Sequence, residues 1–352
     1  MSLLRETCAA IRAPDQTVAR ATQVLFDDRT KPRRSLGRLE DLACQLAAVR
    51  GLCPPPLPNP AIVVMAADHG VADEGVSAYP AEVTAQMLVN FARGGAAINV
   101  LARQVGAQLV VVDMGTRVPA PEATGVIDCR VGPGTRNFTV EPAMTIAQAT
   151  QAIEEGITLA SGLADQGIDL IGLGEMGIGN TTSASALTSA LTGQRAEEVT
   201  GRGTGIDDRV WARKVNAVRK AVTVNRPDPA QPLDVLAKLG GFEIAGLVGV
   251  TLGAVARRVP VVLDGFIAST AALVAARLVP TLAGSLIASH RSVEVGHRAV
   301  LAALSARPLL DLDLRLGEGT GAALALPMVE AAVRLLQEMA TFASAGVSDS
   351  GK

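Results

Sequence analysis

Glu318 stands in a segment whose composition favours acid–base chemistry. Residues 316–321 read Leu-Gly-Glu-Gly-Thr-Gly, just ahead of a long apolar stretch. Glycines on both sides remove side-chain bulk, so a ligand can approach the carboxylate closely, and a dry site would raise the pKa of Glu318 toward that of a useful base. The same pattern fits equally well a first-turn glutamate that stabilises a helix dipole. The residues alone leave both interpretations open.

A glycine-rich segment at residues 172–182 is the most informative stretch of the chain. It reads Gly-Leu-Gly-Glu-Met-Gly-Ile-Gly-Asn-Thr-Thr and lies between a short apolar run and an alanine-rich helical run. Gly177 and Gly179 let the backbone come close to a ligand, and Asn180 or Thr181 would cap the following helix, whose free N–H groups then face an anion. The segment lacks the Lys-Ser/Thr of a Walker loop. It predicts a phosphate site, with an ordinary capped turn as the alternative.

A second glycine loop, Gly-Arg-Gly-Thr-Gly at residues 201–205, precedes a helix that begins near Asp207. Backbone donors of Gly203 and Gly205, with Lys214 of the helix, would close around the same phosphate. On the residues alone, Lys214 is better explained as part of a solvated basic helix face.

Three carboxylates and one histidine gather at residues 68–74. A single histidine without a second one at i+4, and without a spaced aspartate ladder, matches no standard metal site. His290 and His297 are better explained as a strand-end residue and a helix-face residue than as a ligand pair. We therefore predict no metal ligands, and a structured loop against an aromatic ligand at residues 68–80.

Five short apolar runs, each ending near a polar residue, indicate the fold class. The runs are residues 62–65 before Asp68, 109–112 before Asp113, 170–173 before Glu175, 261–263 before Asp264 and 285–287 before His290. Helix-forming sequence separates them, which predicts an α/β fold with a mostly parallel, Rossmann-like sheet flanked by helices. Ligands of such sheets bind at the carboxyl ends of the strands, where these polar side chains collect.

Helical segments at both ends of the chain predict a small helical lobe. Apolar residues recur at helix spacing from Leu39 to Val49, and three prolines at 54–56 close that segment. The stretch 322–345 predicts one long helix, with a kink at Pro327. The expected division is an N-terminal helical arm at residues 1–56, an α/β catalytic domain at 57–321, and a C-terminal helix at 322–352 that packs with the arm.

The composition restricts the partners. Lys and Arg total 32 against 34 Asp and Glu, and aromatic residues make up 2% of the chain, so nucleic acid is a poor partner for want of basic runs and stacking side chains. Four scattered cysteines form no C-x-x-C pair. Residues 1–10 carry no apolar core of signal-peptide length, and no uninterrupted apolar stretch reaches the length of a membrane span. We expect a cytoplasmic protein with small-molecule substrates.

Taken together, these segments resemble the nicotinate-nucleotide:dimethylbenzimidazole phosphoribosyltransferases, over most of the chain. The motifs that carry the resemblance, in the family's order, are residues 31–40, 67–71 with 75–80, 90–91 with 94–99, 113–115, 172–182, 200–207, 262–266 and 316–321. One departure is visible. The arm of the family usually reads Lys-Pro-x-Gly-Ser-Leu-Gly, and Arg34 replaces the first glycine here. The change concerns the local turn of the arm and not the chemistry.

The resemblance implies roles for particular residues. Glu318 is then the general base, and Glu175 lies beside the substrates. It also implies that Lys214 holds a 5′-phosphate with the loops that contain Gly177, Gly179, Asn180, Thr181, Gly203 and Gly205, that Ser77, Tyr79 and Gln86 line the base pocket, and that Asp264 and Ser292 contact the substrates.

The reaction that the resemblance implies moves ribose 5-phosphate from nicotinate mononucleotide to 5,6-dimethylbenzimidazole, giving α-ribazole 5′-phosphate and nicotinate for the lower ligand of a cobamide. Because the nicotinate ring is already a cationic leaving group, one base suffices and we expect no cofactor or metal. A homodimer is also implied, with a partner's arm at the active-site mouth. The alternatives are a sugar-phosphate or nucleotide kinase, which would need Mg²⁺ ligands, and a non-catalytic nucleotide-binding protein.

Overall fold

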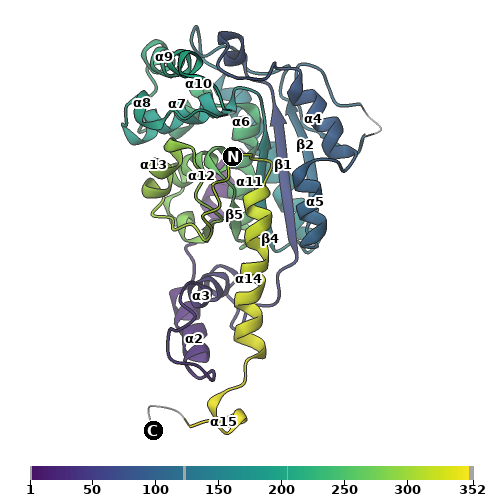
Figure 1. The fold of residues 1–352 in the computed structure, drawn as a ribbon, viewed down its shortest axis with the longest axis vertical. Helices are drawn as coiled ribbons and strands as arrows, with labels where there is room; N and C mark the ends of the chain where they lie inside the picture. Colours follow the sequence, from purple (N-terminus) through teal and green to yellow (C-terminus); the bar gives the residue numbers. More distant parts are fainter. Residues whose placement is uncertain (1, 122–123, 204, 349–352) are drawn as a thin grey trace.

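The centre of the structure is a parallel sheet of six strands with helices on both faces (Figure 1). The structure is a computed structural model that describes residues 2–121, 124–203 and 205–348. Its strand order is β3-β2-β1-β4-β5-β6, and every neighbouring pair is parallel. The predicted fold class is therefore confirmed. The strands are β1 (Pro60–Ala67), β2 (Gln108–Gly115), β3 (Ile127–Asp128), β4 (Leu170–Met176), β5 (Val261–Leu263) and β6 (Leu286–Ala288).

The five predicted runs all form strands, and β3 is the strand that the sequence did not predict. Its two residues are too short for an apolar run to stand out. Helices separate most of the strands. They are α1 (Leu3–Ala10), α2 (Gln16–Asp27), α3 (Arg38–Arg50), η1 (Gly70–Glu74), α4 (Val83–Ala92), α5 (Ala97–Gln104), α6 (Ile146–Asp165), α7 (Asn180–Thr192), α8 (Ala196–Val199), α9 (Asp208–Asn225), α10 (Pro232–Leu239), α11 (Phe242–Ala256), α12 (Phe266–Leu278), η3 (Pro280–Ser285), α13 (Val295–Ala303), α14 (Thr320–Glu338) and α15 (Phe342–Ala345).

Alternate residues of every strand except the exposed β3 face two separate cores. Ile62 and Val64 of β1 pack with α4, α5 and α14, whereas Val63 and Met65 pack with α6, α11 and α12 on the other side. All four are fully or almost fully buried. The strict alternation follows from the two-residue period of a strand, and burial on both faces explains why the strand sequence is apolar at successive positions.

The strand order creates the place for a ligand. The chain runs from β1 outward to β2 on one side, and β4 pairs with β1 on the other side. Where the connections of a parallel sheet diverge in this way, a crevice opens beyond the carboxyl ends of the two central strands. Glu175 at the end of β4 is level with Met65 of β1, and Asp68 follows β1 directly.

Helices α2 and α3 of the arm form a small helical lobe with the C-terminal helix, because α3 packs against α2 and against the outer half of α14 (Figure 1). The first helix of the predicted arm, α1, instead packs on α6 and α11. A buried ion pair organises the arm. Lys31 Nζ lies 2.9 Å from Glu40 Oε1 and above the ring of Phe26, and Gln23 Nε2 donates to Glu40 Oε2 at 2.8 Å. The recognisable motif at residues 31–40 therefore has a structural role within its own chain.

The C-terminal segment differs from the prediction of one helix over 322–345. The long helix α14 ends at Glu338 with Pro327 inside it, and the short helix α15 follows. The chain leaves the helix because residues 339–341 pair with the arm: Thr30 N–H donates to Ala340 O at 3.1 Å. The inner half of α14 also packs on β1, β4 and β5. The domain boundaries after residues 56 and 321 stay a prediction, and residues 349–352 lie outside the described residues.

None of the helices in the described ranges combines the length and the apolar character that crossing a bilayer requires.

Arg34 adopts a left-handed backbone turn at the position where the resemblance predicts a glycine. Its φ is +60°, in the left-handed region where a side chain costs roughly 1–2 kcal/mol. The side chain is exposed. An arginine in place of the expected glycine therefore keeps this turn and adds backbone strain to it.

Replacing Arg34 by glycine should stabilise the protein by up to about 1 kcal/mol, because the relieved strain exceeds the extra backbone entropy that glycine loses on folding. Chemical denaturation measures the change. Arg33→Gly is the matched control, since Arg33 does not adopt a left-handed φ and its replacement should destabilise. A loss of stability in Arg34→Gly as large as in Arg33→Gly would show that the turn is not strained.

Candidate active site

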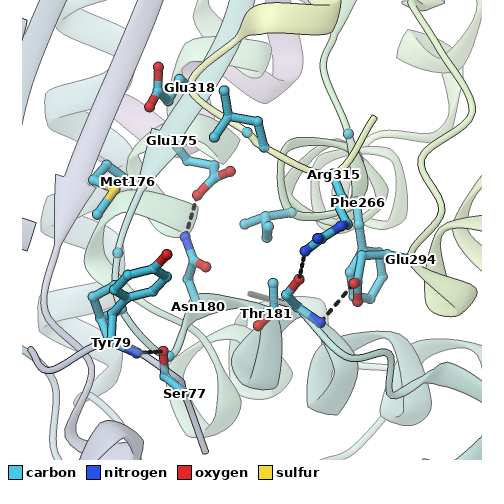
Figure 2. Close-up of a pocket in the computed structure, with 18 of the residues that line it drawn as sticks. Ser77, Tyr79, Glu175, Met176, Asn180, Thr181, Phe266, Glu294, Arg315 and Glu318 are labelled. Carbon is cyan, nitrogen blue, oxygen red and sulfur yellow. Dashed lines mark hydrogen bonds between the residues drawn. The ribbon is translucent and has the colours of Figure 1, made fainter. Parts of the chain in front are cut away.

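A cavity of about 340 Å³ lies at the carboxyl ends of the central strands (Figure 2). Loops after β1, β4, β5 and β6, the start of α7 and one side of α9 enclose it. Most of the predicted site residues line it together, although they come from all parts of the chain. They are Ser77, Tyr79, Glu175, Gly177, Gly179, Asn180, Thr181, Gly203, Lys214, Ser292 and Glu318.

Three predicted residues stand apart from the wall of this cavity in the described part of the chain. Gly205 lines a neighbouring hollow on the far side of its loop. Asp264 is buried behind the wall. Gln86 is exposed on α4, and that helix instead presents Val83 and Met87 to the cavity. Val83 and Met87 are four residues apart and therefore share one face of α4, whereas the side chain of Gln86 leaves the helix in another direction.

Lys214 provides a buried positive charge at one end of the cavity. It is 1% exposed on α9, and burial lowers the pKa of its ammonium group to about 8. Nζ donates to Thr181 Oγ1 at 2.8 Å, which uses one of its three N–H donors. A carbon added to Gly203 would lie 3.0 Å from both Lys214 Nζ and Thr181 Oγ1. The three residues thus converge on one point; Thr204 of the same loop lies outside the described residues.

The loop before α7 differs in one detail from the prediction that Asn180 or Thr181 caps the helix. The cap is Gly179, with φ +98°, and Asn180 is the first helical residue. Asn180 does not cap because its side-chain amide donates to the carboxyl group of Glu175. A side chain on Gly179 would lie 3.3 Å from His69 Cβ and would also be strained by the positive φ. The glycine is needed for the tight approach of this loop to residues 69–72.

Glu318 projects into the opposite end of the cavity from a strained turn. Gly317, Glu318 and Gly319 all have positive φ, of 90°, 64° and 86°. The carboxyl group is 6% exposed, and burial raises its pKa, while a hydrogen bond of 3.3 Å from the N–H of Ile98 to Oε2 acts in the other direction. A non-glycine residue in the left-handed backbone region is strained, and strain of this kind is typical of functional sites.

Asp264 holds this turn from behind. Its carboxylate accepts the N–H groups of Gly319 at 3.0 Å and Gly321 at 2.7 Å, at the N-terminus of α14. Burial raises the pKa of Asp264 to about 7, and these backbone hydrogen bonds oppose that shift. Both oxygens of Asp264 accept backbone N–H groups of the turn that carries Glu318. Contact of Asp264 with the substrates stays a prediction.

Glu175 carries a proton at neutral pH. Its side chain is buried at the end of β4, and desolvation is the largest cause that raises its pKa, to about 8. The negative charges of Asp264, Glu243 and Glu318 raise it further, and the hydrogen bond from Asn180 lowers it. Two carboxyl groups that face one cavity, Glu175 and Glu318, are therefore in different environments (Figure 2). A difference of this kind is typical of paired acid and base groups.

Several residues of the cavity were not predicted. Glu294 and Arg315 lie beside Gly203, and Met176 and Phe266 supply apolar surface (Figure 2). Arg315 immediately precedes the predicted segment 316–321, and Glu294 lies two residues after Ser292. Their closeness in sequence to predicted residues could have pointed to them. Their residue types could not, because a lone arginine or glutamate is usually exposed to solvent.

His69 and Glu243 form a buried pair under the loop at Gly177. Nε2 of His69 lies 2.6 Å from Oε1 of Glu243, and both side chains are fully buried. A side chain on Gly177 would lie 3.2 Å from Glu243 and 3.3 Å from His69. Among the described residues, no three His, Cys, Asp or Glu side chains are grouped so that they could hold a metal ion.

The fold and the cavity define an α/β enzyme that binds a phosphorylated small molecule. The strand order places the cavity where nucleotides bind in such sheets, a buried lysine and a glycine loop lie at one end, and two carboxyl groups lie at the other.

Comparison with known proteins identifies the family. A family model described as phosphoribosyltransferase matches residues 11–347. The chain is 56% identical over 348 residues to a nicotinate-nucleotide--dimethylbenzimidazole phosphoribosyltransferase of Roseiflexus sp. (strain RS-1), covering 99% of each chain. It is 53% identical to one of Geobacter metallireducens, covering 99% of this chain and 98% of that one. The chain belongs to the nicotinate-nucleotide:dimethylbenzimidazole phosphoribosyltransferase family.

A solved structure supports the same assignment. The crystal structure of the enzyme of this name from Thermus thermophilus superimposes with a TM-score of 0.90 at 46% sequence identity, over 95% of this chain and 99% of that chain. The fold and the family thus agree along almost the entire length.

Glu175→Gln should stabilise the protein at alkaline pH. Since the folded pKa of about 8 lies above the ordinary value of 4.5, the native state binds more protons between these values, and wild-type stability falls as the pH rises through that window. Glutamine keeps the shape and does not titrate. The variant should therefore match the wild type near about pH 5 and gain on the order of a few kcal/mol near about pH 9, with loss of activity.

Urea denaturation at both pH values measures this difference. Glu198→Gln, at an exposed carboxylate paired with Arg195, is the control and should show no such gain. A stability difference between Glu175→Gln and the wild type that does not change with pH would contradict the raised pKa.

Proposed function

We propose that this enzyme transfers ribose 5-phosphate from nicotinate mononucleotide to 5,6-dimethylbenzimidazole, with Glu318 as the general base, and so supplies the lower ligand of a cobamide. The observation that carries the proposal is the presence of one buried ammonium group and two carboxyl groups at opposite ends of a single cavity. The relatives that are 52–56% identical over the whole chain bear the name of this activity.

The phosphate binds beside Lys214, Thr181 and Gly203. A phosphate dianion supplies negative charge beside the buried ammonium group, and it can accept hydrogen bonds from the N–H donors that Thr181 leaves unused. Gly177, Gly179 and Ser292 line the same cavity. We propose that all of them contact the nucleotide.

The benzimidazole binds at the other end, beside the two carboxyl groups. Tyr79 and Met176 lie on that side of the cavity near Glu175 (Figure 2), and Met87 and Ile178 add apolar surface. A flat heteroaromatic ring fits such a wall, because aromatic and thioether side chains pack well against its faces. We propose Ser77 and Tyr79 as residues of this base pocket; Gln86, exposed on α4, is not part of the proposal.

The reaction is a direct displacement at C1′ of the ribose. One ring nitrogen of the benzimidazole forms the new bond to C1′ while the bond from C1′ to the pyridinium nitrogen breaks, and the electron pair leaves with nicotinate. The proton on the other benzimidazole nitrogen passes to the carboxylate of Glu318. Attack from the face opposite to the leaving group converts a β-linkage into an α-linkage. Holding both substrates in line supplies a large part of the rate enhancement.

Glu318 rather than Glu175 acts as the base because Glu175 already holds a proton near neutral pH. The pKa of Glu175 is about 8. The strained turn at Glu318, fixed by Asp264 and by the bond of 3.2 Å from its own N–H to Glu175 O, keeps the carboxylate at the cavity wall. Glu175 then contributes as a neutral hydrogen-bonding group beside the reacting atoms.

Glu318→Gln should lower turnover by roughly two to four orders of magnitude, because the amide keeps the shape but cannot accept the proton. The affinity for nicotinate mononucleotide should change little, since Glu318 lies away from the phosphate. Steady-state rates of nicotinate release and calorimetric binding measure the two quantities. Near-normal turnover in this variant would sink the assignment of Glu318.

Lys214→Ala should weaken the binding of nicotinate mononucleotide strongly and leave the weak use of nicotinate riboside nearly unchanged, because the riboside has no phosphate for Lys214 to hold. The ratio of kcat/KM for the two substrates measures the effect. Equal losses on both substrates would indicate that Lys214 has a structural role.

We also propose that the enzyme is a cytoplasmic homodimer. The arm and the rim of the cavity expose large apolar side chains, among them Val24, Leu52 and Leu316, and self-association is the commonest way to cover such surface. A partner's arm at the cavity mouth would complete the enclosure. This assembly is compatible with the internal role of Lys31 and Glu40, because residues 32–35 of the same motif stay exposed.

Sedimentation equilibrium at micromolar concentration should give a mass near twice 36.1 kDa. Val24→Asp places a charge on the exposed face of α2 and should shift the equilibrium toward the monomer if the arm lies at the interface. It is a cleaner variant than deletion of the arm, which would uncover the face of α14 that packs on α3. A monomer at all concentrations would refute the homodimer.

A further inference from the structure

Glu294 places a carboxylate in the wall of the cavity at its cationic end. The residue directly precedes α13, is 7% exposed, and accepts the backbone N–H of Gly203 on Oε1 at 2.8 Å (Figure 2). Its other oxygen, Oε2, is buried and has no hydrogen-bond partner among the residues that the structure describes. A half-satisfied, buried carboxylate is costly in free energy. Its position beside an anion site requires an explanation.

The contacts of Glu294 are those that a bound phosphate would make. It takes the N–H of the glycine that converges with Lys214 and Thr181. It is also the charged group that opposes the effect of burial on the pKa of Lys214 and raises it. The carboxylate thus accepts the hydrogen bond of the Gly203 N–H and lies near the positive charge of Lys214, and a bound phosphate oxygen would make the same two interactions.

The loop does not need Glu294 to keep its place. Arg315 Nη1 donates to Gly203 O at 3.1 Å, and Trp211 Nε1 donates to Thr200 O at 2.9 Å, so the loop is held from two other directions. Gly201 lies against the Glu294 carboxylate without a side chain between them, since an added carbon would lie 2.1 Å from Oε2. The carboxylate therefore fits closely over the loop and is not its sole support.

We propose that Glu294 is an internal stand-in for the substrate phosphate, which occupies the Gly203 amide before the substrate binds and competes with the phosphate for it. The proposal rests on the proposed function, in that a phosphate binds beside Lys214. A built-in competitor keeps Lys214 charged until the substrate arrives. It also limits the affinity for any phosphate ester, so that a product that bears the same phosphate as the substrate can leave.

Calorimetric titration with inorganic phosphate tests the proposal on the full-length protein. Glu294→Gln keeps an acceptor in the same place and removes the charge. Glu294→Ser removes the carboxylate and places before α13 a residue that is favoured at helix N-caps. Each variant should bind inorganic phosphate about tenfold more tightly than the wild type, because one like charge near the bound anion is lost. Each should lower the KM for nicotinate mononucleotide in proportion without raising kcat. Glu198→Gln, in the wall of the neighbouring hollow, should change neither.

The proposal is overturned if either Glu294 variant binds phosphate no more tightly than the wild type. Weaker binding by Glu294→Ser with unchanged binding by Glu294→Gln would mark Glu294 as a support of the loop. Lys214→Ala must abolish phosphate binding; if it does not, the anion binds elsewhere and the proposal also falls. Nicotinate release by the wild type is measured separately. If the wild type releases no nicotinate but both variants bind phosphate more tightly, the proposed reaction fails and this inference stands.

Discussion

The burial of charge at one edge of the sheet is the constraint on which the rest of the site depends. Moving a charged group out of water costs several kcal/mol of free energy, and interactions close to the buried group must offset this cost. In this site Asp264 accepts backbone N–H groups at the start of α14, Glu175 retains a proton, and Lys214 donates a hydrogen bond to the hydroxyl oxygen of Thr181. None of these fully compensates Lys214, and a phosphorylated substrate is the natural completion.

The same constraint explains why strain collects at Glu318. A carboxylate at the start of a long helix could easily sit in the first turn, exposed and unstrained. Here Asp264 takes the terminal N–H groups, so Glu318 lies just ahead of the helix, in a left-handed conformation between two glycines. The packing of α14 on β1, β4 and β5 supplies the stability that holds the strained turn.

The sheet could be predicted from the sequence because its strands are buried on both faces, which gives apolar runs with polar ends. The positions of Glu175, Glu318 and the two glycine loops followed from those ends and from the family's motifs. The function of Asp264 did not, because its partners are backbone groups 55 and 57 residues away in sequence. Glu294 was missed for the same reason: its partner, Gly203, is 91 residues distant. The end of α14 depends on pairing with the arm, which no local pattern contains.

The most direct test of the central claim combines the unmodified enzyme with nicotinate mononucleotide and 5,6-dimethylbenzimidazole in chelator-treated buffer without ATP. Nicotinate release and the configuration of the new glycosidic bond are followed together by NMR. The proposed mechanism, an in-line displacement with one base and one buried cation, predicts that nicotinate and an α-linked riboside phosphate form in equal amounts. A β-linked product, or no release of nicotinate until ATP and Mg²⁺ are added, would contradict the account.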